Sequence, residues 1–318
     1  MIAYIVRRLF QLVLVLIGVS MITFTIMFLI PGDPAVTLAG KGATPETVAR
    51  IRHRLALDKP VYVQYGMFVG RLVRGDLGES YQFNRPVMQM IKEALPNTAQ
   101  LAIAAVLIEL LGIPLGIYSA LRQFTFWDTA LTTAALIIWG IPVFVLGLFM
   151  QWFFGLKLNL FPIAGGGGET VLWVIPADYL NLSCLVLPAV TLGLIEVAYI
   201  SYMQRASMLE VIRSDYVRTA RAKGLPERTV VLKHGLKNAL IPVMTIAGID
   251  LGALMGGAIL TETVFSRPGI GLMIYTAIGS LDLPVVAGGV LFATLVYVIA
   301  NLVVDIGYAL VDPRIRYE

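Results

Sequence analysis

Long apolar runs alternate with short polar connections along most of the chain. A membrane-spanning helix needs about 20 mostly apolar residues. Six windows meet this requirement, at approximately residues 9–30, 97–121, 129–156, 180–203, 239–261 and 284–309. The first window is uncharged and lacks a small-residue cleavage site, so we expect a retained helix and not a signal peptide. The pattern predicts an all-α integral membrane protein with six transmembrane helices.

Basic residues in the connections predict the orientation of these helices. Connection 204–238 carries eight Lys or Arg residues and three acidic residues, which gives it a net charge of +5. Short loops rich in Lys and Arg stay in the cytoplasm. Both the N and the C terminus then fall on the cytoplasmic side. Segment 31–96 lies outside despite its nine basic residues, because a loop of 66 residues is too long for the charge rule to govern.

The same pattern divides the chain into three parts. Residues 1–30 form a cytoplasmic N-terminal end and the first transmembrane helix, residues 31–96 an external loop or subdomain, and residues 97–318 the core transmembrane domain. In the external part, residues 45–60 predict a short helix and residues 61–75 a helix in the membrane interface. A small packed cap without a binding role is an equal alternative.

Composition agrees with a membrane location and excludes several kinds of site. The chain has 318 residues, of which 58% are hydrophobic and 14% charged, and its mean hydropathy is +0.82. The basic pI of about 9.1 reflects loop charges that set orientation, so it does not indicate nucleic acid as a partner. One cysteine, Cys184, and two histidines exclude an intrachain disulfide and a Cys/His metal cluster. We expect a chain surrounded by lipid, with no metal site.

Connection 204–238 begins with a predicted short helix. Ser214 or Asp215 can cap this helix. Tyr216, Ala220 and Gly224 share one of its faces, and basic side chains occupy the others. The pattern therefore predicts a short amphipathic helix on the cytoplasmic side.

A sharp turn and a second helix follow. Gly224 suits the left-handed position that ends a helix, and Pro226 suits the first turn of the next one. The second helix is expected to continue through His234 into the fifth span. Such a bent basic element predicts a docking site for another protein, whereas the alternative is a solvated basic loop that only sets orientation.

Several motifs along the chain resemble those of a single transporter family. They are "IPGDPA" at 30–35, "GDLGES" at 75–80, "DYVRTARAKGL" at 215–225, "KHGLKNALIPV" at 233–243, "GAILTETVFSRPGIG" at 257–271, "DLPVV" at 282–286 and "NLVVDIGYALVDPRIRY" at 301–317. In this order, over essentially the whole chain, they are similar to the inner-membrane permease subunits of ATP-binding-cassette (ABC) importers, in the branch that moves dipeptides and oligopeptides. The loop motif of the wider family, Glu-Ala-Ala-x3-Gly-x9-Ile-x-Leu-Pro, is degraded here, because Arg218 and Thr219 stand at the Glu-Ala positions.

The resemblance implies a fold, partners and a role for the loop. It implies the type I ABC importer permease fold in the inner (cytoplasmic) membrane, paired with a homologous second permease, two cytoplasmic ATPase subunits and an external substrate-binding protein. ATP and Mg would be bound by the ATPase chains, and this chain has no phosphate-binding loop motif of its own. The loop would be the coupling helix. The positions implied to contact the ATPase are Asp215, Tyr216, Arg218, Thr219, Ala220, Arg221, Lys223, Gly224, Leu225 and His234.

Three acidic residues fall inside predicted spans. An unpaired charge in a bilayer costs about 2.5–3.5 kcal/mol even on lenient scales, so Glu109, Glu196 and Asp250 must face protein or water. One interpretation is a substrate path that meets the ammonium end of a peptide; the other is hydrogen bonding between helices. Glu262 lies near a span end, where we expect an interfacial position.

Glycines in the fifth span predict a close helix contact. Gly248, Gly252 and Gly256 are spaced four residues apart around Asp250, and small residues at this spacing allow another helix to approach closely. The contact is either packing within this subunit or, as the resemblance favours, the interface of a two-subunit pore.

The sequence therefore predicts a permease subunit of an ATP-driven peptide importer that is not itself an enzyme. The same machinery could carry nickel chelates, glutathione or oligosaccharides. A secondary transporter would usually show inverted repeats, which the sequence lacks. A membrane enzyme would need a Ser/His/Asp, Cys/His or metal cluster at catalytic spacing, and none is present.

Overall fold

The computed structural model describes residues 2–29, 34–39, 42–54, 56–166, 170–171, 175–176, 179–255 and 258–311. Its helices, in chain order, are α1 (Ile2–Leu29), α2 (Pro34–Ala39), α3 (Pro45–Arg54), α4 (Val61–Val73), α5 (Val87–Glu109), α6 (Gly112–Leu121), α7 (Phe126–Gly140), α8 (Val143–Met150), α9 (Tyr179–Ile212), α10 (Asp215–Ala222), α11 (Glu227–Thr229), α12 (Leu236–Met255), α13 (Ile259–Val264), α14 (Ile270–Gly279) and α15 (Leu283–Val311). Two π-helices, η1 (Gln151–Lys157) and η2 (Val230–Gly235), extend α8 and precede α12. Strands β1 (Thr170–Val171) and β2 (Ile175–Pro176) form a short antiparallel hairpin.

Most of the predicted apolar windows are long helices. Within the described residues, four stretches are long and apolar enough to cross a membrane: 87–121, 182–212, 227–255 and 283–303. A fifth candidate combines α7 with α8 and η1, although the two halves meet at an angle of 100°. Helix α1 contributes a shorter apolar stretch, Phe10–Ile26. The membrane-protein class is confirmed, while the count of six spans stays a prediction.

Two expected boundaries differ from the structure. Helix α5 begins at Val87, ten residues before the window expected at residue 97. The fifth window was expected to reach residue 261, but α12 ends at Met255 and a separate helix, α13, begins at Ile259. Residues 87–96 include Lys92 and Glu93, so they fall outside an apolar window although they are helical. Between residues 255 and 259 the sequence has no charged residue, so hydropathy does not mark where α12 stops and α13 starts.

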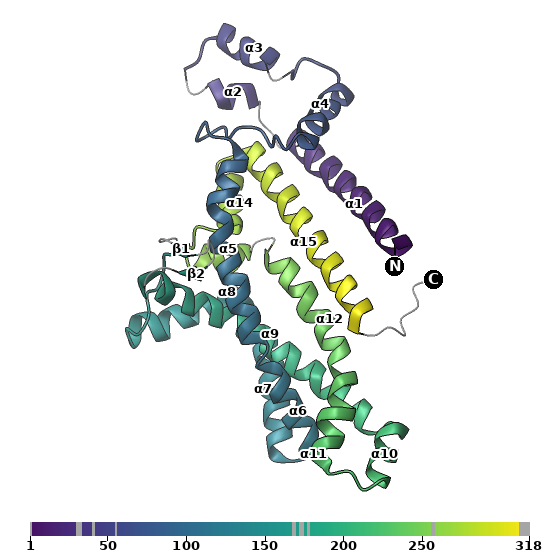
Figure 1. The fold of residues 1–318 in the computed structure, drawn as a ribbon. Coiled ribbons are helices and arrows are strands. Elements are labelled where there is room, and N and C mark those ends of the chain that lie inside the picture. Colours follow the sequence, from purple (N-terminus) through teal and green to yellow (C-terminus); the bar gives the residue numbers. More distant parts are fainter. Residues whose placement is uncertain are drawn as a thin grey trace.

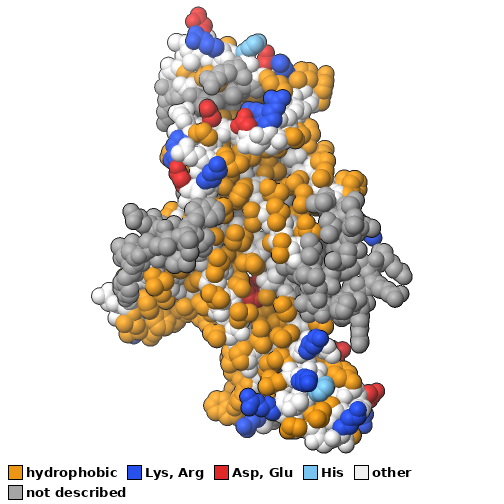
Figure 2. Space-filling view, in the orientation of Figure 1, with side chains coloured by type: hydrophobic (Ala, Val, Ile, Leu, Met, Phe, Trp, Pro, Cys, Tyr) orange, Lys and Arg blue, Asp and Glu red, His pale blue; other side chains and the backbone are white. Residues whose placement is uncertain are grey.

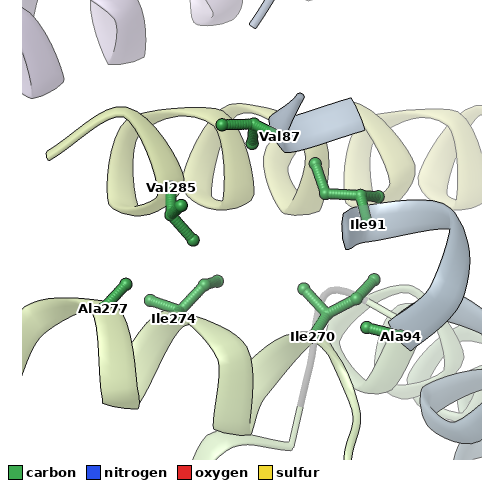
Figure 3. Close-up of a cluster of buried hydrophobic side chains, with 7 residues drawn as sticks. All are labelled: Val87, Ile91, Ala94, Ile270, Ile274, Ala277 and Val285. Atoms are coloured by element: carbon green, nitrogen blue, oxygen red, sulfur yellow. The ribbon is translucent and has the colours of Figure 1, made fainter. Parts of the chain in front are cut away.

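The early start of α5 is explained by packing at this end of the molecule. Val87, Ile91 and Ala94 follow one another at helical spacing on α5 and face Ile270 and Ile274 of α14 (Figure 3). Ala277 and Val285 complete this buried cluster. The first turns of α5 therefore belong to a packed core between α5, α14 and α15, and not to a loop.

Charged side chains gather at the two ends of the molecule. Helices α2, α3 and α4 lie at one end, beyond α1, and α10 and α11 lie at the other (Figure 1). Between them the surface is a broad apolar band (Figure 2). Helix α1 contacts α15, and the two run in opposite chain directions, because α1 ends and α15 begins toward the end that carries α4 (Figure 1). This arrangement is that of a chain built around a bilayer.

Candidate functional site

The predicted cytoplasmic helix–turn–helix is present as α10, a turn and α11. Helix α10 begins after Ser214, whose backbone is extended. The Ser214 hydroxyl does not cap the helix, because it donates instead to the backbone oxygen of Val211 at 2.6 Å. The carboxylate of Asp215 lies in the first turn, where the helix dipole favours negative charge.

Helix α10 packs on the rest of the chain through a small apolar face. Val217 and Ala220 are buried and form a cluster with Val230 of η2, against which Val211 of α9 packs. Ala220 belongs to the expected face, but Val217 accompanies it and Tyr216 does not. The Tyr216 side chain is 43% exposed, and its hydroxyl accepts a hydrogen bond from the Asn238 amide at 2.7 Å.

The remaining faces of α10 and its turn are open to a partner. Of the positions implied to contact the ATPase, the exposed ones are Asp215, Tyr216, Arg218, Thr219, Arg221, Lys223, Gly224 and Leu225. Arg218 lies 3.6 Å from Asp215, and their side chains are 74% and 99% exposed. Exposed ion pairs of this kind contribute little to stability, so the charge of Arg218 remains available to a partner.

The turn after α10 has the predicted conformation. Gly224 has a φ of +76° and donates its backbone N–H to Arg221 at 2.9 Å. Pro226 stands one position earlier than expected, as the residue that precedes α11. The Arg221 guanidinium donates two hydrogen bonds to Glu227, at 2.6 and 3.1 Å, which raises the pKa of Arg221. This pair joins the end of α10 to the start of α11 across the turn.

A continuous helical segment connects the turn after α10 to the apolar band. It runs from Glu227 through η2 to Met255. His234 is half-buried within the π-helix, as expected for a residue on the way to the fifth span. One side of η2 is fixed by Val230 and Val231, which are buried against α9 and α10. The predicted continuity between the turn after α10 and the fifth apolar window is confirmed.

The three intramembrane acids come from three helices and lie together. The Glu196 carboxyl on α9 and the Asp250 carboxyl on α12 interact with each other, and the Glu109 carboxyl on α5 interacts electrostatically with both. Glu109 is 1% exposed, and neither of its carboxylate oxygens has a hydrogen-bond partner. Among the described residues, no basic side chain forms an ion pair with any of the three. Acidic atoms reach the surface within the apolar band (Figure 2).

The glycine contact on α12 is made within the chain. A Cβ added to Gly252 would lie 2.9 Å from the Cβ of Ala300 and 3.3 Å from the backbone oxygen of Tyr297, both on α15. Gly248 is half-buried, and Gly256 lies outside the described residues. Gly252 is therefore occupied by helix packing inside this subunit.

Sequence reasoning missed a buried polar cluster at the α13–α14 connection. Glu262 is fully buried, contrary to the interfacial position expected, and accepts hydrogen bonds from the Thr98 hydroxyl and the Leu272 backbone. Burial raises the pKa of Glu262 and lowers that of the fully buried Arg267. Arg267 donates to Asn97 and to Gln100, so the cluster fastens this connection to α5. The signal in the sequence was that Glu262 and Arg267 carry opposite charges five residues apart.

The sequence of this chain matches known families over nearly its whole length. Residues 112–317 match the model of the binding-protein-dependent transport system inner membrane component, and residues 1–102 match the model of the N-terminal part of such membrane components. The chain belongs to this family of transport components.

Among the described residues of this transport component, no group of three or more His, Cys, Asp or Glu side chains could hold a metal ion.

Full-length relatives of this transport component carry specific names. It is 43% identical to the dipeptide transport system permease protein DppB of Alkalihalophilus pseudofirmus over 100% of both chains. It is 40% identical to the di/tripeptide transport system permease protein DppB of Pseudomonas aeruginosa, also over 100% of both chains. Identity to the dipeptide transport system permease protein DppB of Escherichia coli is 36% at the same coverage.

Proposed function

We propose that this chain is the permease subunit that forms half of the translocation pathway of an ATP-driven importer of dipeptides and oligopeptides. The observation that carries the proposal is the exposed basic helix α10, joined by the Gly224 turn to a helix that continues into the apolar band. Family membership and the names of the full-length relatives support the same function.

In this proposal, ATP is hydrolysed by partner chains and this chain supplies no catalytic residue. Two cytoplasmic ATPase subunits bind ATP and Mg, and one of them receives α10 and Leu225 in a surface groove. A homologous second permease completes the pathway, and an external binding protein delivers the peptide. Arg218, whose pair with Asp215 at 3.6 Å is exposed, and Lys223 can pair with acidic groups of the ATPase, whereas Arg221 already makes two hydrogen bonds to Glu227.

The proposed topology follows from the charges and from the arrangement of elements. All six predicted helices span the inner membrane in the type I importer fold, with both termini in the cytoplasm. The basic connection 204–238 lies on the cytoplasmic side. Residues 31–96 then face the binding protein, and residues 97–318 form the core domain.

The intramembrane acids mark the proposed substrate path. A dipeptide carries an ammonium group, and Glu109, Glu196 and Asp250 offer carboxyl groups without a basic partner among the described residues. Their place at the junction of α5, α9 and α12 suits a path between moving helices. Isosteric changes test this role: Glu196→Gln with Asp250→Asn should lower ATP-driven dipeptide uptake while assembly persists. The exposed acid Glu210, changed to Gln, is the control, and undiminished uptake by the double variant would remove these acids from the path.

A charge reversal tests coupling to an ATPase. The complex carrying Arg218→Glu and Lys223→Glu should lose co-purifying ATPase and dipeptide uptake in vesicles, because interfacial charge reversal costs both attraction and encounter rate. Lys233→Glu with Lys237→Glu changes the same charge in the same connection outside α10, and it should retain more of both activities. If the α10 variant keeps full ATPase binding and uptake, connection 204–238 only sets orientation.

A further inference from the structure

The cytoplasmic half of the chain contains a buried ion pair that none of the proposed contacts uses. Asp128, in the first turn of α7, is 3% exposed. Arg205 of α9 donates to its two carboxylate oxygens at 2.6 and 2.9 Å. The Ser119 hydroxyl of α6 donates at 2.6 Å, and the backbone N–H of Phe124 in the α6–α7 turn donates at 3.0 Å. The carboxylate thus receives four hydrogen bonds and ties three elements together.

Close backbone packing extends this connection along α6 and α9. A Cβ added to Gly116 would lie 2.5 Å from the backbone oxygen of Ser201, and one added to Gly112 would lie 2.8 Å from that of Val197. Only glycine allows the two helices to approach so closely at these points. The α6–α7 hairpin is therefore fastened to α9 by sterically tight packing and by the Asp128–Arg205 pair.

The same end of α9 is joined to the coupling segment. Ala120 of α6, Met208 of α9 and Val231 of η2 share one buried cluster. One helical turn further along α9, Val211 packs on the cluster of Val217 and Val230 that seats α10. A continuous set of contacts thus leads from α10 through α9 to Asp128.

We propose that Asp128 and Arg205 are positioning residues that lock the α6–α7 hairpin to α9, so that α10, α9 and the hairpin move as one body when the ATPases close. The inference rests on the proposed function, because it concerns how force applied at α10 reaches the spans. Packed cores and interfaces switch between discrete arrangements and do not deform gradually. The bidentate geometry suits Arg, and Lys would provide charge without the same directional restraint.

Neutral and conservative variants separate positioning from folding. In the reconstituted complex, Asp128→Asn with Arg205→Met leaves no unpaired buried charge, so assembly should persist. The amount of dipeptide imported per ATP hydrolysed should fall about 2- to 30-fold. For Arg205→Lys, the amount of dipeptide imported per ATP hydrolysed should lie between the values for the wild type and the double variant. The exposed acid Glu210, neutralised as Glu210→Gln on the same helix α9, is the control and should leave the ratio unchanged. An assembled double variant with the wild-type ratio would overturn the proposal.

If the Asp128/Arg205 variants fail to assemble, spin-label distances in a complex that keeps both residues test whether α10, α9 and the hairpin move as one body. In a Cys184→Ala background, labels at Phe126→Cys and Arg213→Cys lie on the proposed body, whereas a label at Val303→Cys lies on α15. Between the nucleotide-free and ATP-bound complex, the 126–213 distance should stay constant and the 126–303 distance should change. A 126–213 distance that changes as much as the other would contradict a single body. Absence of ATP-driven uptake in the wild-type complex would instead refute the proposed function.

Discussion

At the residue scale, Gly224 decides how α10 connects to α11. Its φ of +76° is a conformation that other L residues adopt at a cost, and an added Cβ would meet no atom within 4 Å. A substitution at this position therefore acts through the backbone and not through a clash. Because the position lies in the turn of the proposed coupling surface, a substitution there should affect transport and not membrane insertion.

Two substitutions at Gly224 separate these effects. Gly224→Val should impair coupling, because a β-branched residue in the left-handed region costs at least about 1–2 kcal/mol and the turn would open to relieve it. Gly224→Asn should be tolerated far better, since Asn visits this region readily. The measurements are ATPase co-purification and dipeptide uptake in vesicles. Equal activity of the two variants would show that the angle between α10 and α11 does not matter.

Local residue patterns predicted the turn at Gly224, but they did not predict which other side chains are buried. A glycine followed by Leu and Pro after a short helix indicates a helix end regardless of the rest of the fold. The burial of Val217 and of Glu262 depends on contacts with other elements of the fold. No spacing within the sequence encodes those contacts, so they became visible only in the structure.

At the element scale, the contact between α12 and α15 makes a distinct prediction. Gly252→Leu would force side-chain atoms into Ala300 and Tyr297, and overpacking of this kind costs about 1–3 kcal/mol. The isolated subunit in detergent should therefore melt at a lower temperature even without a second permease. Gly18→Leu on α1, where an added Cβ meets nothing within 4 Å, is the control. If Gly252→Leu lowers stability only in the assembled complex, the glycine belongs to a subunit interface.

Hydropathy located the apolar helices but not their breaks. The window at 129–156 was expected as one span, whereas α7 and α8 meet at an angle of 100° next to Pro142. Proline lacks an N–H and restricts the residue before it, so it allows such a break. It does not require one: Pro96, Pro188 and Pro242 lie inside helices. A proline alone therefore does not predict where a helix bends.

At the scale of the whole molecule, an apolar band separates two ends that carry charged side chains (Figure 2). Helices α2 to α4 and helix α10 lie at opposite ends (Figure 1), in agreement with the side assignments drawn from loop charges. The acid cluster could be suspected from depth alone, but its convergence could not, because three residues far apart in sequence meet only after α5, α9 and α12 pack.

Site-specific cross-linking tests the central claim, that α10 docks on a separate ATPase at the cytoplasmic face. The chain has one cysteine, so Cys184→Ala provides a cysteine-free background. In native membranes, a bifunctional thiol reagent should join Arg218→Cys to an ATPase chain. Tyr62→Cys, whose parent side chain is 76% exposed on α4, should give no such product and should react with an impermeant thiol reagent from outside the cell. Failure of Arg218→Cys to cross-link, or cross-linking of the ATPase through Tyr62→Cys, would contradict the account.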